Sequence, residues 1–213
     1  MIRVAASLWS VAPPELESVS RRLVDDGLAR FHWDHADGTI GPAGGFTPAE
    51  ARRLGAGAAA EAHLMHRDPR PAIAEWAEFC DAVAVHVSEP HWRECFGLIR
   101  GHGALPVAAV SSFDELRAAA DAEDPLASGA LVMTIRPGHA GSAFDPASYD
   151  LVAEASRLGF GRVGVDGSVT EERAARLVDR GANWIVSGTS LVGADDRAAW
   201  IANVQGRSGQ RAG

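Results

Sequence analysis

Two histidines and two aspartates stand where apolar runs of the chain come to an end. His32 and Asp34 lie two residues apart at the end of one run, and His63 and Asp166 each lie at the end of a further run. Residues two apart on a strand point to the same face of a sheet. Imidazole nitrogens and carboxylate oxygens are ligands that divalent transition metals accept. The set therefore predicts a metal site with two carboxylates able to carry protons, as an enzyme acting beside a carbonyl group needs.

Eight short apolar runs alternate along the chain with segments that begin like helices. This alternation predicts a single (β/α)8 barrel over residues 1–213, with residues 207–213 as a disordered tail. An open doubly wound sheet is the alternative, because periodicity alone does not separate the two. The carboxyl ends of barrel strands share one rim, where the four side chains would meet. The expected strands are Ile2–Leu8, Ala29–Trp33, Ala58–Met65, Ala82–Val87, Leu105–Val110, Ala130–Thr134, Arg162–Val165 and Trp184–Ser187.

Capping residues mark where the helices should begin. Thr47-Pro48-Ala49-Glu50 combines a capping box with proline at the first helical position, and Ser112-Phe113-Asp114-Glu115 repeats the box. Asp68-Pro69 and Asp145-Pro146 each place a capping residue before a proline. Thr170 precedes two glutamates, which suit the positive end of a helix dipole. Each signal falls between two of the expected strands.

Charge and composition exclude several classes of function. The chain has 213 residues and a net charge of −8, which argues against general binding to nucleic acid or to anionic membranes. It shows no apolar run long enough to cross a bilayer and no secretory leader pattern, so we expect a cytoplasmic protein. Cys80 and Cys95 do not make a disulfide framework, and we expect both to be small buried hydrophobic residues.

The chain contains no lysine, and all of its basic residues are arginines. Schiff-base aldolase chemistry needs an amine nucleophile, so it is excluded. The phosphate loop of nucleotidases, which depends on a lysine, is excluded as well. Glycine-containing rim loops offer another way to hold a phosphate, because backbone N–H groups and helix N-termini bind anions without lysine.

Several motifs in a fixed order carry a resemblance to one enzyme family. From about Val4 to about Gly193 the chain resembles the ribulose-phosphate 3-epimerases, and no single motif would suffice. The motifs are Ser7-Leu8-Trp9-Ser10, His32 to Gly38, Ala62-His63-Leu64-Met65, Val132-Met133-Thr134-Ile135-Arg136-Pro137-Gly138, Val165-Asp166-Gly167-Ser168 and Gly188-Thr189.

The resemblance implies a role for each matching residue. His32, Asp34, His63 and Asp166 would ligate one divalent ion, which could be Zn²⁺, Fe²⁺, Mn²⁺ or Co²⁺. Asp34 and Asp166 would also be the catalytic residues and move protons on opposite faces of a phosphorylated ketose. The substrate would contact Ser7, Met65, Met133, Gly138, Gly141, Gly167, Ser168, Gly188 and Thr189. The plainer alternatives are that the methionines fill the core and that the glycines only serve turns.

Departures from the family pattern leave the substrate open. Ala36 replaces the usual methionine, and the segments 39–43, 111–113 and 136–142 differ from the family's loops. We expect interconversion of D-ribulose 5-phosphate and D-xylulose 5-phosphate. The alternatives are 3-epimerisation of another ketose phosphate, or a catalytically silent barrel that binds a sugar phosphate or a partner protein.

Other features of the site and its partners also stay open at this point. Arg136 and His139 would contact the substrate or face solvent, with equal weight. Self-association into a homo-oligomer is compatible with the sequence. The remaining histidines are expected at the surface or in packing; they are His35, His66, His86, His91, His102 and His139.

Overall fold

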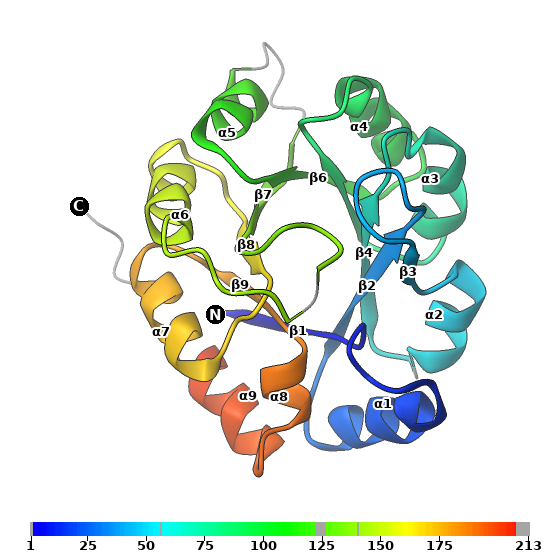
Figure 1. Cartoon of the computed structure of the whole chain (residues 1–213), viewed down its shortest axis with the longest axis vertical. Helices are drawn as coiled ribbons and strands as arrows, with labels where there is room; N and C mark the ends of the chain where they lie inside the picture. The colour runs from blue at the N-terminus through cyan, green and yellow to red at the C-terminus, as the bar shows by residue number, and fades with distance from the viewer. Residues whose placement is uncertain (1, 56, 122–126, 140, 208–213) are drawn as a thin grey trace.

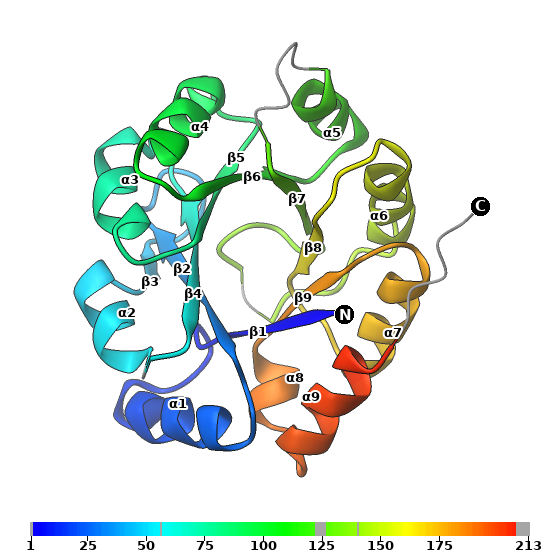
Figure 2. The same cartoon turned by 180° about the vertical axis from the view of Figure 1, so that it is seen from behind.

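A closed ring of parallel strands forms the centre of the computed structural model, which describes residues 2–55, 57–121, 127–139 and 141–207. The sheet runs in the order β1-β9-β8-β7-β6-β5-β4-β2-β3, and β1 also pairs with β2, which closes the ring. Helices surround the strands in both views (Figures 1 and 2). The closed order confirms the predicted (β/α)8 barrel and excludes the open sheet.

The strands lie close to the eight predicted runs. Strand β2 is longer than predicted, because the chain folds back after it and the two-residue strand β3 pairs antiparallel with its end. His32 and Asp34 therefore lie within β2 and not at its end. The strands are β1 Arg3–Ser7, β2 Arg30–Ala36, β3 Gly44–Gly45, β4 Ala59–Met65, β5 Ala82–His86, β6 Leu105–Val110, β7 Gly129–Met133, β8 Val163–Asp166 and β9 Trp184–Ser187.

Helices begin at most of the predicted caps. Thr47 forms the full capping box with Glu50, and Ser112 and Thr170 each accept a backbone hydrogen bond as N-caps. Two helices start later than their Asp-Pro signals. The helices are η1 Pro13–Glu15, α1 Leu16–Asp25, α2 Pro48–Leu54, α3 Arg70–Ala77, α4 Trp92–Gly101, α5 Phe113–Ala120, α6 Ser148–Arg157, α7 Glu171–Asp179, α8 Thr189–Val192 and α9 Arg197–Gln205.

Alternation along each strand divides the core into two parts. On β2, the side chains of Phe31 and Trp33 join the layer between the sheet and the helices, which is the larger hydrophobic cluster. The intervening His32 and Asp34 point into the barrel. A smaller apolar cluster fills the rest of the interior and includes Leu131 and Trp184. The two-residue period of a strand thus separates packing residues from the candidate site residues.

The remaining sequence predictions have mixed outcomes. Cys80 and Cys95 are buried free thiols, as predicted, and burial raises the pKa of Cys95 to about 11. The predicted tail lies outside the described residues, apart from Arg207. No helix within the described part of the chain is long and apolar enough to cross a membrane.

Candidate active site and metal centre

The four predicted ligand residues converge on the barrel axis from three strands. His32 and Asp34 come from β2, His63 from β4 and Asp166 from the end of β8. One ligand atom from each lies within 4.8 Å of the others. Register places Asp34 beside His63, and β1 brings Ser7 beside His32. Residues 134 positions apart in the chain therefore share one site because the inward faces of the parallel strands meet inside the closed ring.

The His32 ring is oriented by a second carboxylate. Its Nδ1 lies 2.8 Å from Oε1 of Glu61, while Nε2 is buried and has no hydrogen-bond partner among the described residues. That Nε2 lies 3.5 Å from Oδ1 of Asp34 and 3.9 Å from Oδ2 of Asp166. A buried nitrogen without a partner, aimed between two carboxylates, is the arrangement that a metal ion would complete.

His63 presents its other nitrogen to the same point. Its Nδ1 lies 3.1 Å from Oδ1 of Asp34 and 3.6 Å from Oδ2 of Asp166. On the far side of the ring, Nε2 lies 3.0 Å from Nε2 of His86. Donors of this type and number suit a divalent transition metal, so the residues present fit the ion that the sequence predicted.

The charges of the site keep Asp34 ionised. Burial alone would raise the pKa of Asp34, but His32 and His63 hold it well below its usual range. Burial alone would also lower the pKa of both histidines, and the neighbouring carboxylates raise it instead. A divalent cation between these groups would favour the carboxylate form of Asp34 in the same way. The hydroxyl of Ser7 donates to Oδ2 of Asp34 at 2.7 Å and orients that carboxylate.

Sequence reasoning missed Glu61 entirely, and it assigned His86 only to the surface or to packing. His86 is buried against His63, and burial together with the charge of His63 lowers its pKa to about 3. One signal was available for Glu61. A glutamate two residues before His63 in an apolar run must lie on the same strand face as that histidine. A buried carboxylate at such a position needs a partner.

A cavity of about 480 Å³, within the range usual for small-molecule sites, opens beside the four candidate ligand residues. Asp34 and Asp166 line it, whereas His32 and His63 lie beneath its floor with 0% exposure. All nine predicted substrate residues also line it, as do residues the sequence did not single out. The predicted nine are Ser7, Met65, Met133, Gly138, Gly141, Gly167, Ser168, Gly188 and Thr189, and the additional residues include Trp9, Ser10, Ile135, Arg173 and Ser190.

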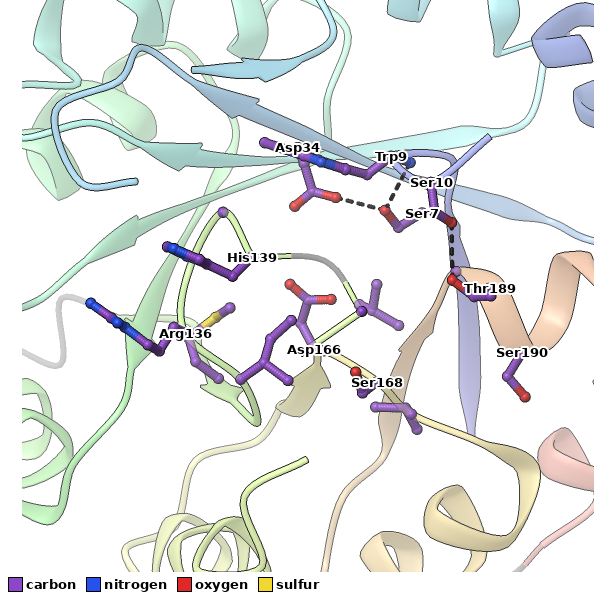
Figure 3. Close-up of a pocket in the computed structure, with 18 of the residues that line it drawn as sticks. Ser7, Trp9, Ser10, Asp34, Arg136, His139, Asp166, Ser168, Thr189 and Ser190 are labelled. Carbon is purple, nitrogen blue, oxygen red and sulfur yellow. Dashed lines mark hydrogen bonds between the residues drawn. The ribbon is translucent and has the colours of Figure 1, made fainter. Parts of the chain in front are cut away.

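The two ends of the cavity differ in chemistry (Figure 3). At one end the hydroxyls of Ser10 and Thr189 lie 3.1 Å apart, near Ser190. Arg136 and His139 lie on the other side of Asp166, and the guanidinium of Arg136 points away from that carboxylate in this view. The guanidinium of Arg136 makes no hydrogen bond or ion pair to any other residue that the structure describes, although the carbonyl oxygen of Arg136 accepts a hydrogen bond from the N–H of His139 at 3.2 Å. The cavity therefore has a hydroxyl-rich end and an end bordered by Arg136 and His139.

Backbone conformation shapes the loop after β8. Gly167 has φ +114°, and a Cβ there would lie 2.4 Å from Cγ1 of Ile135, so only glycine fits. Ser168 follows with φ 49°, and its carbonyl oxygen accepts a hydrogen bond from Arg173 at 2.6 Å. Arg173 also lies over the ring of Phe144, 4.8 Å from its centroid. The loop is thus held in a left-handed turn with an arginine at its side.

Comparison with known proteins assigns the family. A model described as "Ribulose-phosphate 3 epimerase family" matches residues 3–192. The chain belongs to the ribulose-phosphate 3-epimerase family. It is 27% identical to the ribulose-phosphate 3-epimerase of Bacillus subtilis, over 97% of this chain and 99% of that protein. It is 25% identical to the enzyme of that name from Methanocaldococcus jannaschii, over 96% and 90% of the two chains.

Solved structures support the fold alone, because their sequence identity is low. The 3-hexulose-6-phosphate synthase of Salmonella typhimurium has a TM-score of 0.69 at 14% identity, over 96% of this chain and 97% of that one. The phosphoribosyl anthranilate isomerase of Thermus thermophilus has a TM-score of 0.66 at 17% identity, over 96% and 99%. Family membership makes this chain an isomerase, and it supports an epimerase of sugar phosphates.

Proposed function

We propose that the protein is a metal-dependent ketose-phosphate 3-epimerase, in one barrel domain over residues 1–213, that interconverts D-ribulose 5-phosphate and D-xylulose 5-phosphate. One observation carries the proposal. The carboxylates of Asp34 and Asp166, from β2 and β8, both face the cavity and approach the same nitrogen of His63, at 3.1 Å and 3.6 Å. Two carboxylates at one point of a cavity are what inversion beside a ketone requires.

The two aspartates would divide the proton transfers. One carboxylate removes the proton from C3, the electron pair of that C–H bond moves toward the C2 carbonyl, and an enediolate forms. The other aspartate, which enters the cycle protonated, then gives its proton to the opposite face of C3, so each turnover leaves the first aspartate protonated and the second ionised. A single base could not easily reach both faces, so each aspartate serves one face and the reaction runs in either direction.

His32, Asp34, His63 and Asp166 would hold one divalent ion beside the substrate oxygens. The ion would supply positive charge that stabilises the developing enediolate. The chain's own residues supply the rest of the chemistry. Ser7 fixes the orientation of Asp34 through its 2.7 Å hydrogen bond, and Met65 and Met133 border the reacting carbon with apolar surface that limits access of water.

The phosphate would bind at the hydroxyl-rich end of the cavity. Backbone N–H groups of the turn at Gly167 and Ser168, and those following Gly188, are available there, with the hydroxyls of Ser10 and Thr189. Arg173 adds a positive charge beside the same turn. We therefore assign the phosphate to this end, and Gly138 and Gly141, which also line the cavity, are further candidates for backbone contacts with the substrate.

The test is an assay of several ketose phosphates in D₂O. Purified protein should convert D-ribulose 5-phosphate to D-xylulose 5-phosphate, with deuterium incorporated at C3 as seen by NMR. Conversion of a six-carbon ketose phosphate in preference to the pentulose would support the alternative substrate that the altered loops leave open. Binding of these compounds without exchange at C3 would show a non-catalytic barrel and overturn the proposal.

Location and assembly stay predictions. We propose a cytoplasmic enzyme, and a curated relative 27% identical to this chain is named the cytoplasmic isoform of ribulose-phosphate 3-epimerase in Oryza sativa. Self-association and the absence of nucleic-acid and membrane partners likewise rest on the sequence. Sedimentation of the purified protein would establish its oligomeric state.

A further inference from the structure

We infer that Glu61 is a positioning residue for the metal, acting through His32, and that it makes the two histidine ligands chemically unequal. The inference rests on the proposed metal site. Glu61 lies on β4 directly beside His32 in the register of the sheet. Its Oε1 is 2.8 Å from Nδ1 of His32, and both side chains are buried. It does not line the cavity, so it would touch neither substrate nor reacting atoms.

The hydrogen bond determines which nitrogen of His32 faces the metal. A carboxylate only accepts, so Nδ1 of His32 must carry the proton. In the neutral ring that would bind a metal, the lone pair then stays on Nε2, which is the buried nitrogen without a partner that faces Asp34 and Asp166. Without this acceptor the ring could protonate at Nε2 and lose its ligand atom. Glu61 thus selects the tautomer that can bind an ion.

His63 is backed by a neutral group instead of a carboxylate. Its Nδ1 faces the site and its Nε2 meets His86 at 3.0 Å. An anionic acceptor makes an imidazole more basic and more electron-donating toward a metal than a neutral acceptor does. We therefore expect His32 to be the stronger of the two histidine ligands.

Glu61 is itself held in place by Arg30, the first residue of β2. Nη1 of Arg30 lies 3.5 Å from Oε2 of Glu61, and the same guanidinium makes two bonds of 2.6 Å to Asp81. Oε1 is therefore left to His32 alone among the described residues, and Oε2 faces a cation. A carboxylate fixed at both oxygens in this way holds the ring in one orientation.

The experiment measures metal affinity and needs no substrate. Apo-protein is titrated with Zn²⁺ and, separately, with Co²⁺ against a competing chelator dye. Glu61→Gln keeps an acceptor but removes the charge, and should weaken binding about tenfold. Glu61→Met removes both and should weaken it more, up to about 100-fold. Asp81→Asn is the matched control, because it removes a carboxylate on the other side of Arg30 and leaves the His32–Glu61 bond intact; its affinity should equal that of wild type.

The outcomes separate the inference from the metal proposal itself. Wild-type protein that binds neither ion would overturn the metal site. If wild type binds the metal and both Glu61 variants bind it with the same affinity, the role of Glu61 is overturned and the metal site stands. The same conclusion follows if Asp81→Asn loses as much affinity as the Glu61 variants. Melting of the apo-proteins checks that each variant is folded.

In Zn²⁺-loaded wild type, long-range ¹H–¹⁵N NMR should show His32 protonated at Nδ1 and His63 at Nε2. The opposite tautomer of His32 would contradict the inference.

Discussion

The interior of the barrel has two unlike halves. Strands β2 and β4 send polar side chains inward, including His32, Asp34 and His63, whereas β6 and β7 send in Val107 and Leu131. Burying ionisable groups costs free energy unless each finds a partner, while burying aliphatic groups stabilises the fold. Inside one closed ring, the strands that supply most of the reactive side chains are therefore different from those that supply the aliphatic side chains that stabilise the fold. Substitutions in the apolar half should then lower stability and leave the activity of the folded protein unchanged, whereas substitutions in the polar half should chiefly lower activity.

The largest effect should come from the polar half together with Asp166, which reaches the same site from β8. Asp34→Asn and Asp166→Asn should each lower kcat about 10³-fold, because an amide cannot accept the C3 proton. Each should lower the melting temperature by no more than metal removal does, because size and shape are kept and only the charge of one metal ligand is lost. Steady-state kinetics and thermal unfolding of the same preparations measure both. Near-normal turnover in either variant with metal bound would remove that aspartate from the mechanism.

The apolar half should give the opposite response. Leu131→Ala removes a fully buried side chain from the inner cluster and should lower the free energy of unfolding by about 2–5 kcal/mol. Its metal content and kcat at a temperature where it stays folded should match wild type. Denaturant unfolding and elemental analysis provide the measurements. A large loss of metal in this variant would show that the two halves are coupled.

Removing the metal should lower the free energy of unfolding by less than the upper value of about 5 kcal/mol expected for Leu131→Ala. An ion at 100 times its dissociation constant contributes about 2.7 kcal/mol, since it binds the folded chain alone. A chelator should therefore lower the melting temperature and abolish turnover, and one added equivalent of divalent ion should restore both. Leu131→Ala serves as the control, with a chelator-induced shift equal to that of wild type. Full activity after chelation would contradict the metal proposal.

The smallest effect is expected in the loop that follows β7. Arg136 borders the end of the cavity away from the proposed phosphate position, so it could contact only the sugar hydroxyls. Arg136→Ala should therefore raise KM for D-ribulose 5-phosphate about fivefold, the ~1 kcal/mol typical of one hydrogen bond, with kcat unchanged. Arg67→Ala, an arginine on another rim loop that does not line the cavity, is the control and should leave KM unaltered. An unchanged KM in Arg136→Ala would place that guanidinium in solvent. A loss confined to a six-carbon ketose phosphate would identify the substrate that this loop holds.

Local sequence pattern was sufficient to predict the strands and helices and to select the four candidate ligand residues. Eight apolar runs became strands, and Thr47, Ser112 and Thr170 cap helices as predicted, because capping and side-chain alternation depend on neighbours in the chain. Strand ends in a barrel meet on one rim, so residues at those ends could be grouped before their distances were known. The nine predicted substrate residues came from the resemblance to the family, and all of them line one cavity, although their contacts with substrate stay predictions.

The chain by itself determined which residues could do chemistry; the tertiary structure decided which atoms of those residues face one another. Strand register places Glu61 against His32, and the pairing of β4 with β5 places His86 behind His63. The folded ring also places Arg173 beside the cavity and separates Arg136 from the hydroxyl-rich end. Pairing between strands depends on packing of the whole ring, because a shift of one residue would turn every inward side chain outward. No local pattern specifies that choice, so the partners of the ligands became visible only in the folded barrel.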